Sequence, residues 1–367
     1  MSHGEMLTQK ARYHSRCTGI GHQASIEQFK ASHMQDPVPA ASRDQARLEA
    51  AVFERLGGTI DYCAHPAGIA HVRPSADHLA VELDPKLGPE HSLPEHCLGA
   101  LLPTQYTGPV EDEELAPGGI AGIRILEVDS IGLHLGLAGT DGRVILTGLE
   151  PKQWWSLLGK HRAFCADNDL VPLWDRPVLT TFEATYLAGD SSWLEERADR
   201  AWIASGLLRR IALLHTVTKP YGVRYWQHGL GWKFELTYEH GVPVQHDVLL
   251  AHLTHPGWGL ALQPTREHCA CKPCDCDGGA ERNCWYKLDA GGEHRDEIMF
   301  HFRRTRAGYE SARAYGRLVA AGAEPDWLAQ ALPARHQPAV PQPVSLTNGG
   351  PAKALGLMSR TERKSSG

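Results

Sequence analysis

The residues whose types best suit chemistry lie in one short segment, 268–284, which holds five of the nine cysteines in the chain. Two of them, Cys271 and Cys274, have the C-x2-C spacing with which two thiolates bind one tetrahedral ion from a single turn. Gly278 and Gly279 would let the chain fold back, so that a later cysteine could close the site. We therefore expect a zinc ion, in preference to an iron–sulfur cluster. Its candidate ligands are His268, Cys269, Cys271, Cys274, Cys276 and Cys284.

The role expected for this ion is structural. The segment lies between two expected strands, near Leu262 and Trp285, where a metal ion would order the loop. Its neighbours do not include an open coordination position beside a general base, which a catalytic zinc site would need. A standard zinc finger or ribbon would also have a second C-x2-C pair, and that pair is missing. A thiol-rich loop without metal is therefore the alternative.

Two further sets of residues could bind a ligand or a metal ion. His252 and His255 are three positions apart on an expected helix and could share a ligand, although an H-E-x-x-H motif is absent. Carboxylates that could bind Mg²⁺ as in nucleases fall on expected strands, at Glu82, Asp84, Glu127 and Asp129. A solvated strand face explains these carboxylates more simply. The run 226–232 mixes aromatic residues and glycine, and a hydrophobic core is its simpler explanation.

The chain lacks the motifs that would name a reaction. It has no Gly-rich phosphate loop, no G-x-S-x-G turn, no set of kinase motifs and no dinucleotide-binding fingerprint. Two function classes stay open. The first is a non-enzymatic binding or adaptor protein with a structural metal loop and a protein partner, regulatory or associated with a mobile element. The second is a metal-dependent enzyme that acts on nucleic acid, for which the histidines and the strand carboxylates argue.

Nucleic acid is kept as a second class of partner because of residues 5–33. They are expected to form two short helices around Thr18–Gly21, an outline that a DNA-binding helix-turn-helix shares with any helical hairpin. The second helix offers few basic or amide side chains for contacts with phosphates. We therefore expect no tight binding to DNA.

The composition is that of an ordinary globular chain. Of its 367 residues 42% are hydrophobic, and its net charge of -6 gives no global attraction to nucleic acid. The first residues lack the apolar core of a signal peptide, and no run approaches 18 apolar residues, so no membrane partner is expected. Single cysteines at Cys17, Cys63, Cys97 and Cys165 fit a reducing compartment. We expect a cytoplasmic protein.

The elements that must position these residues indicate an α+β fold. Residues 119–162 read as alternating extended runs, a hairpin turn at Thr140–Gly142, a further strand and a helix. Residues 220–255 resemble this segment, and fainter versions span 68–102 and 285–322. The expected fold is antiparallel sheet with packed helices, built from repeated β-hairpin-plus-helix units, although generic hairpin-and-helix architecture would look similar.

Two helices have clear signals. Ser42 and Gln45 are expected to form a capping box at the start of one. A longer helix is expected over 192–215, with Arg209 and Arg210 near its end, where cations suit the helix dipole. The expected organisation is a helical N-terminal segment at 1–58, α+β units at 59–185 and 186–331, the Cys-rich loop 268–284 within the second unit, and a disordered tail at 332–367.

Overall fold

The fold is described by a computed structural model. It describes residues 2–32, 35–57, 65–84, 93–108, 116–189, 191–229, 231–239, 242, 244–268, 284–290, 297–305, 309–320 and 322–333. Helices and mixed sheets share these residues, which confirms the predicted α+β class with a helical N-terminal segment. The predicted tail lies outside the described residues from 334 on. None of the helices in the described ranges is long and apolar enough to cross a membrane.

Five strands form the N-terminal sheet, in the order β1-β2-β6-β5-β4. Their bounds are β1 Ile69–Pro74, β2 His78–Leu83, β4 Ile123–Val128, β5 Leu133–Leu137 and β6 Arg143–Thr147. β2 and β6 run parallel, and the other neighbours are antiparallel. Alternate residues of β5 and β6, such as Leu135 and Val144, are buried in the core. The residues between them form the outer face of this sheet.

Five further strands form the C-terminal sheet, in the order β10-β11-β12-β9-β8. Their bounds are β8 Gly222–His228, β9 Gly231–Glu239, β10 Gln263–His268, β11 Cys284–Asp289 and β12 Glu297–Thr305. Within this sheet β9 and β12 run parallel, and the other neighbouring strands are antiparallel. The burial pattern of β9 alternates, with Phe234 and Leu236 in the core and Lys233 and Glu235 on the outer face.

The two sheets have the same topology. Each begins with a hairpin, continues through a helix to three antiparallel strands, and pairs the last of these strands in parallel with the second strand of the hairpin. The repeat is therefore larger than the predicted hairpin-plus-helix unit. Segment 220–255 corresponds to 69–101, whereas the predicted match, 119–162, holds the three-strand part. Alternating apolar residues occur in both parts, so the sequence pattern does not distinguish them.

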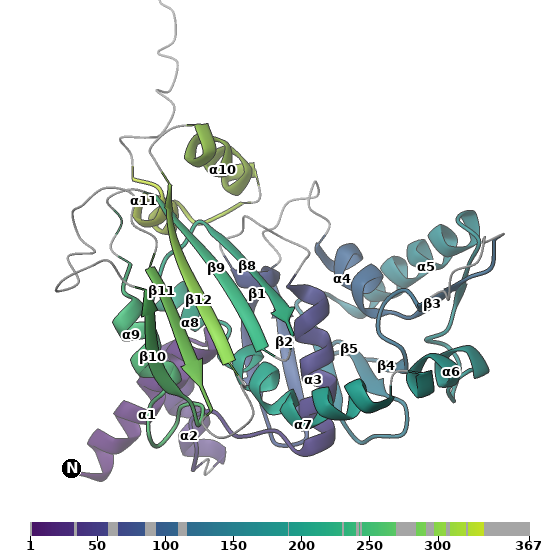
Figure 1. Ribbon diagram of the computed structural model, residues 1–367, viewed down its shortest axis with the longest axis horizontal. Helices are drawn as coiled ribbons and strands as arrows, with labels where there is room; N and C mark the ends of the chain where they lie inside the picture. Colours follow the sequence, from purple (N-terminus) through teal and green to yellow (C-terminus); the bar gives the residue numbers. More distant parts are fainter. Residues whose placement is uncertain are drawn as a thin grey trace, which may run out of the picture.

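Helices accompany each sheet. Their bounds are α1 His3–Thr18, α2 His22–Ser32, α3 Arg43–Leu56, α4 Leu93–Leu101, α5 Pro151–Asp167, α6 Thr181–Gly189, α7 Ser191–Leu208, α8 Leu213–Thr216, α9 His246–Leu253, α10 Tyr309–Ala320 and α11 Pro325–Ala331, with a 3-10 turn at Pro66–Gly68 and a small sheet of β3 Thr104–Tyr106 and β7 Leu170–Pro172. One continuous core includes buried side chains of both sheets and of α3, α4, α5, α7 and α9. In Figure 1 no helix is drawn in front of β9, β11 and β12.

Helix α3 links the two sheets. Its first turn is capped by the Ser42 hydroxyl, which accepts a hydrogen bond from the backbone N–H of Gln45 (3.3 Å). The predicted capping box is only half formed, because the Gln45 side chain exchanges two hydrogen bonds with the backbone of Arg143 on β6. At the other end of α3, the Phe53 ring stacks on Tyr225 of β8, with ring centroids 4.2 Å apart and planes at 12°. The helix therefore contacts both sheets.

A buried ion pair joins α3 to the residue after α7. Arg209 donates from Nε to Glu49 Oε2 (2.7 Å) and from Nη2 to Oε1 (2.6 Å), and the side chains are 1% and 0% exposed. The Ser205 hydroxyl and the Gln45 amide donate to the same carboxylate, and Arg209 Nη1 donates to the carbonyl of Pro39. A buried pair is favourable when such additional hydrogen bonds satisfy its remaining donors and acceptors.

The long helix predicted over 192–215 is interrupted, because after Leu208 the backbone changes to i+3 hydrogen bonds, from the N–H of Arg210 to the carbonyl of Leu207 and from the N–H of Ile211 to that of Leu208. Helix α7 ends at Leu208, and the short α8 begins at Leu213. Arg209 and Arg210 do not lie exposed at a helix end, because both are buried. Arg210 Nη2 donates to the carbonyl of Trp258 (2.7 Å). Charge interactions with a helix dipole contribute only about 0.3–1 kcal/mol, so a bidentate buried pair outweighs them.

The buried pair gives a stability prediction. Replacing Glu49→Gln should lower the free energy of unfolding by about 3–5 kcal/mol, because it leaves the Arg209 guanidinium buried without its counter-charge. Urea unfolding measures this difference. The double variant Glu49→Leu with Arg209→Met should cost less than Glu49→Gln alone, since no buried charge is left uncompensated.

The control is an exposed ion pair between the same two helices. Arg43 Nη2 lies 2.9 Å from Asp199 Oδ1, with side chains 76% and 70% exposed. Asp199→Ala should cost less than about 1 kcal/mol. Equal losses in Glu49→Gln and Asp199→Ala would contradict the role given to the buried pair.

Helices α1 and α2 form the predicted helical hairpin, and His14 lies inside it. Gly19 ends α1 in the left-handed region, at φ +81°. The rings of His14 and Phe29 of α2 meet edge-on, with centroids 5.5 Å apart. Nδ1 of His14 lies 2.5 Å from the carbonyl oxygen of Pro37. Burial lowers the pKa of His14, and the hydrogen bond to Pro37 opposes this only in part. His14 therefore resists protonation in the folded chain.

The protein should accordingly lose stability as the pH falls below about 6.5, the ordinary histidine pKa. In that range the unfolded chain binds a proton at His14 that the folded chain resists, so the free energy of unfolding decreases toward the lowered pKa. The variant His14→Gln should show a smaller loss between about pH 7.5 and about pH 5.5 in urea unfolding. His228→Gln, at the exposed end of β8, is the control and should behave as wild type. Parallel pH profiles for wild type and His14→Gln would refute this assignment.

Candidate functional site

The predicted zinc loop is described only at its two ends. Four predicted ligands lie outside the described residues: Cys269, Cys271, Cys274 and Cys276. His268 is the last residue of β10 and Cys284 is the first residue of β11. The two strands pair antiparallel, with His268 opposite Trp285. The strands predicted on either side of the loop are therefore confirmed, and they hold its ends next to each other.

Cys284 lies on the inner face of the C-terminal sheet. Its side chain is 5% exposed and shares that face with Tyr286 and Leu288. Across the strand pair it lies opposite Phe302 of β12. A zinc ion that used Cys284 would therefore have to lie at the core side of the start of β11.

The predicted pair of histidines comes together around α1. The ring centroids of His252 and His255 lie 5.8 and 5.5 Å from that of Tyr13. The Tyr13 hydroxyl donates to the backbone carbonyls of His252 and Trp258, both at 2.9 Å. These contacts join α1 to α9 and to the turn that follows it.

The ring nitrogens of these histidines are largely engaged in hydrogen bonds. His252 Nδ1 donates to the carbonyl of Val248 (2.7 Å), and its Nε2 accepts from Arg16 (3.0 Å). His255 Nδ1 accepts from the backbone N–H of Trp258 (3.2 Å). Burial lowers the pKa of His252, and the positive charge of Arg16 adds to this effect. The pair is arranged to pack the helices and not to share a metal ion.

The strand carboxylates fall into two separate places. β2 and β4 are separated by β6 and β5 in the N-terminal sheet, so their carboxylates do not form one nuclease-like centre. On β2, Glu82 lies 2.7 Å from His71 Nε2. Burial lowers the pKa of His71, and Glu82 opposes this. Just after β2, Asp84 Oδ2 lies 2.5 Å from His65 Nδ1.

The other two carboxylates meet a histidine that the sequence analysis missed. Glu127, Asp129 and His134 form what we call the hairpin cluster, at the turn between β4 and β5 on the outer face of the N-terminal sheet. His134 Nε2 lies 3.1 Å from Asp129 Oδ1, and its Nδ1 lies 3.4 Å from Glu127 Oε1. One ligand atom from each residue lies within 4.8 Å of the other two. The set has the composition of a metal site.

Asp129 shapes the turn as well as the cluster. Its Oδ1 accepts hydrogen bonds from the backbone N–H groups of Ile131 (2.8 Å) and Gly132 (3.1 Å), an Asx turn. The donors at Gly132 and Ile131 lower the pKa of Asp129, and His134 adds to this. The sequence did contain a signal for His134, because strict alternation along β5 puts it on the face opposite the leucines.

The outer face of the C-terminal sheet is a second candidate surface. Its residues are Arg224, Trp226, Lys233, Glu235, Thr237, Trp285, Lys287, Asp289, Glu297, Met299, His301 and Arg303. Trp285 stacks on His301 with ring centroids 3.9 Å apart and planes at 5°. Trp226 is 42% exposed, whereas Trp232 is in the core. The core interpretation of the run 226–232 therefore holds for Trp232 and is wrong for Trp226.

Opposite charges alternate across this face. Glu235 lies 3.4 Å from Arg303 Nη1 and 3.7 Å from His301 Nδ1. Lys287 pairs with Glu297. Burial lowers the pKa of His301, which Glu235 opposes, so the ring stacked on Trp285 stays neutral at physiological pH. The face combines aromatic surface with charges that are already paired.

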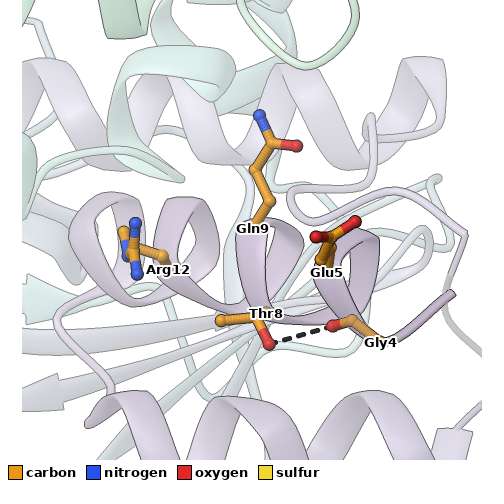
Figure 2. Close-up of a pocket in the computed structure, with 5 residues that line it drawn as sticks. All are labelled: Gly4, Glu5, Thr8, Gln9 and Arg12. Carbon is orange, nitrogen blue, oxygen red and sulfur yellow. Dashed lines mark hydrogen bonds between the residues drawn. The ribbon is translucent and has the colours of Figure 1, made fainter. Parts of the chain in front are cut away.

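A hollow on α1 offers no convergent chemistry. Its lining residues are Gly4, Glu5, Thr8, Gln9 and Arg12, and Figure 2 shows that all of them come from this one helix. Thr8 Oγ1 donates to the carbonyl of Gly4 (2.9 Å), and the Glu5 carboxylate accepts from the backbone N–H of Ser2 (2.6 Å). Because one helix supplies every lining residue, the hollow lacks the convergent polar groups of a binding site.

Comparisons with protein-family models, with curated proteins and with solved structures gave no match to this chain.

Proposed function

We propose that the protein is a non-enzymatic binding or adaptor protein that recognises a protein partner through the outer face of the C-terminal sheet. The observation that carries the proposal is the presence of Trp226, Trp285 and Met299 on this face. Trp285 and Met299 lie on the neighbouring strands β11 and β12, whereas Trp226 lies on the edge strand β8, which β9 separates from β12. Tryptophan, methionine and arginine are enriched in protein interfaces, where aromatic anchors contribute much of the binding energy. Hydrogen-bonded strands hold such anchors in fixed positions, which lowers the entropic cost of binding.

The charges on the face favour a protein over nucleic acid. Binding to nucleic acid depends on cations that neutralise phosphates, so a nucleic-acid surface carries an excess of Lys and Arg. Here Glu235 lies beside Arg303, and Glu297 beside Lys287. Mixed charges of this kind suit a partner with complementary charges of both signs, and they give specificity for its orientation.

The geometry gives less support to a metal-dependent enzyme acting on nucleic acid. In the described part of the chain, the carboxylates of β2 and β4 are kept apart by two strands. His252 and His255 are held in packing and hydrogen-bond contacts with α1. A phosphodiester-cleaving centre would need these groups to converge on one ion or one water molecule.

The zinc loop is part of the same proposal. We propose that Cys271 and Cys274, with two of the other four candidate ligands, hold one structural zinc ion. Its support is the thiol spacing together with the pairing of β10 and β11, which fixes both ends of the loop. Free thiols persist in a reducing compartment, and the free, buried Cys17, Cys97 and Cys165 suit such a setting, which we propose to be the cytoplasm.

The zinc proposal predicts about one equivalent of zinc in protein purified without chelator or affinity-column metal. The double variant Cys271→Ser with Cys274→Ser should lose it, because serine does not replace a thiolate ligand at neutral pH. Elemental analysis is the measurement. The buried Cys97→Ser variant is the control and should keep the metal. Less than about a tenth of an equivalent in the wild type would exclude the site.

The binding proposal predicts that one substitution on the outer face removes the partner. The full chain, used as bait in lysate of its native cells, should capture a protein that cross-links to Lys233 or Lys287. Trp226→Glu should reduce this capture at least about tenfold, because it places an uncompensated charge among the aromatic anchors. Trp226 is exposed, so the variant should fold normally, and its melting temperature checks this.

The matched control is Arg73→Glu, on the outer face of the other sheet. It reverses an exposed charge and should leave capture unchanged. Equal capture by wild type, Trp226→Glu and Arg73→Glu would refute the assigned surface. If the wild type binds an oligonucleotide in a salt-dependent way and Trp226→Glu abolishes this binding, the partner of this face is nucleic acid and not protein.

A further inference from the structure

We infer that the hairpin cluster is a binding site for a divalent first-row transition ion, with Glu127 and the Nδ1 atom of His134 as ligands and Asp129 as the group that orients the ring. The inference concerns the opposite sheet from the proposed partner surface and does not depend on it. It is also independent of the zinc loop, since the two sites share no residue.

A β-bulge creates the juxtaposition. The register of β4 and β5 shifts between Ile125 and Glu127, and after the shift Glu127 lies opposite His134. Both residues then belong to the outer face of the sheet. His134 is 3% exposed, whereas the side chains of Glu127 and Asp129 are 51% and 37% exposed. The histidine is thus held in place while solvent reaches the carboxylates, so water molecules can complete the coordination of an ion.

The hydrogen bonding of His134 defines which nitrogen is available. Nε2 lies 3.1 Å from Asp129 Oδ1, and an ionised carboxylate only accepts hydrogen bonds, so Nε2 carries a proton. Nδ1 has no hydrogen-bond partner among the described residues and is buried. A buried ring nitrogen that makes no hydrogen bond requires an explanation, and an ion shared with the carboxylate that it faces supplies one. This second observation distinguishes the cluster from a group of surface acids.

The distance between the two ligand atoms fits one ion. Nδ1 of His134 and Oε1 of Glu127 are 3.4 Å apart, too long for a good hydrogen bond. Two ligands that each lie about 2.1 Å from one ion at a tetrahedral angle are about 3.4 Å apart. Asp129 then completes the carboxylate–histidine–metal arrangement that fixes the tautomer of a ligating histidine and raises its basicity.

One neighbouring cation competes with the ion. Arg143 Nη1 lies 3.4 Å from the same Glu127 oxygen, and the Arg143 side chain is 44% exposed. The flexible and exposed arginine can move into solvent when a divalent ion, with twice its charge, occupies the site. Mixed nitrogen and carboxylate ligands with water suit Mn²⁺ or Zn²⁺ better than Ca²⁺. Mn²⁺ is the sharper probe, because thiolates of the Cys-rich loop prefer softer ions.

The test is a titration of the full chain with Mn²⁺, in which electron paramagnetic resonance measures the free ion. Wild type should bind about one equivalent with a Kd below about 1 mM. Glu127→Gln should weaken binding by at least about tenfold, and Asp129→Asn by a similar factor through loss of the orienting carboxylate. Arg143→Gln should tighten binding, because it removes the competing cation. The side chain of Glu127 is half exposed, so Glu127→Gln should leave the packing of the core and the fold unchanged.

A histidine–carboxylate pair on the same sheet face provides the control. His71 Nε2 already lies at hydrogen-bond distance, 2.7 Å, from Glu82, so Glu82→Gln should leave Mn²⁺ binding unchanged. Absence of saturable binding in wild type would overturn the inference. An affinity that Glu127→Gln changes by less than about twofold would overturn it as well. In that case the cluster would be a set of polar contacts between His134 and two carboxylates without a bound ion.

Discussion

The ion pair between Glu49 and Arg209 is the constraint on which the arrangement of the two sheets depends. It joins α3, which precedes the N-terminal sheet in the chain, to the residue after α7, which precedes the C-terminal sheet. Apolar contacts between two helices tolerate small shifts, whereas a buried bidentate pair does not, because any slide leaves a charge without its partner. The hydrogen bond from Arg209 to the carbonyl of Pro39 places the segment before α3 in the same network.

The same network determines which sheet faces remain for binding. Gln45 fixes the backbone at the start of β6, and Phe53 packs on β8, so α3 lies against the inner sides of both sheets. A sheet buries one face against helices and can leave the other in solvent. Because this architecture occurs twice, the chain has two outer faces, although on that of the N-terminal sheet Ala80, His134 and Ile145 are buried. One carries tryptophans among paired charges, and the other carries the hairpin cluster.

Sequence reasoning succeeded where the interactions are local. The turn at Thr140–Gly142, the cap at Ser42 and the alternation along β5 and β9 involve residues close in the chain, and they predict the α+β class. The burial of Arg209 was not predicted, because its partner Glu49 lies 160 residues away, where no local pattern shows it. The repeat was misaligned because alternation identifies a strand but not its neighbours in the sheet.

The hairpin cluster was not predicted because it forms through one extra residue, a β-bulge in β4. Glu127 and Asp129 were recognised as strand carboxylates, but a regular ladder continuing from the pair of Ile125 with Leu135 would set Leu126 opposite His134. The bulge shifts this register by one residue and puts a carboxylate there instead. Arg143 then connects the cluster to the core, since its backbone is held by Gln45 and its guanidinium lies beside Glu127. The network that holds α3 in the core therefore also fixes the backbone position of Arg143, whose guanidinium faces the cluster.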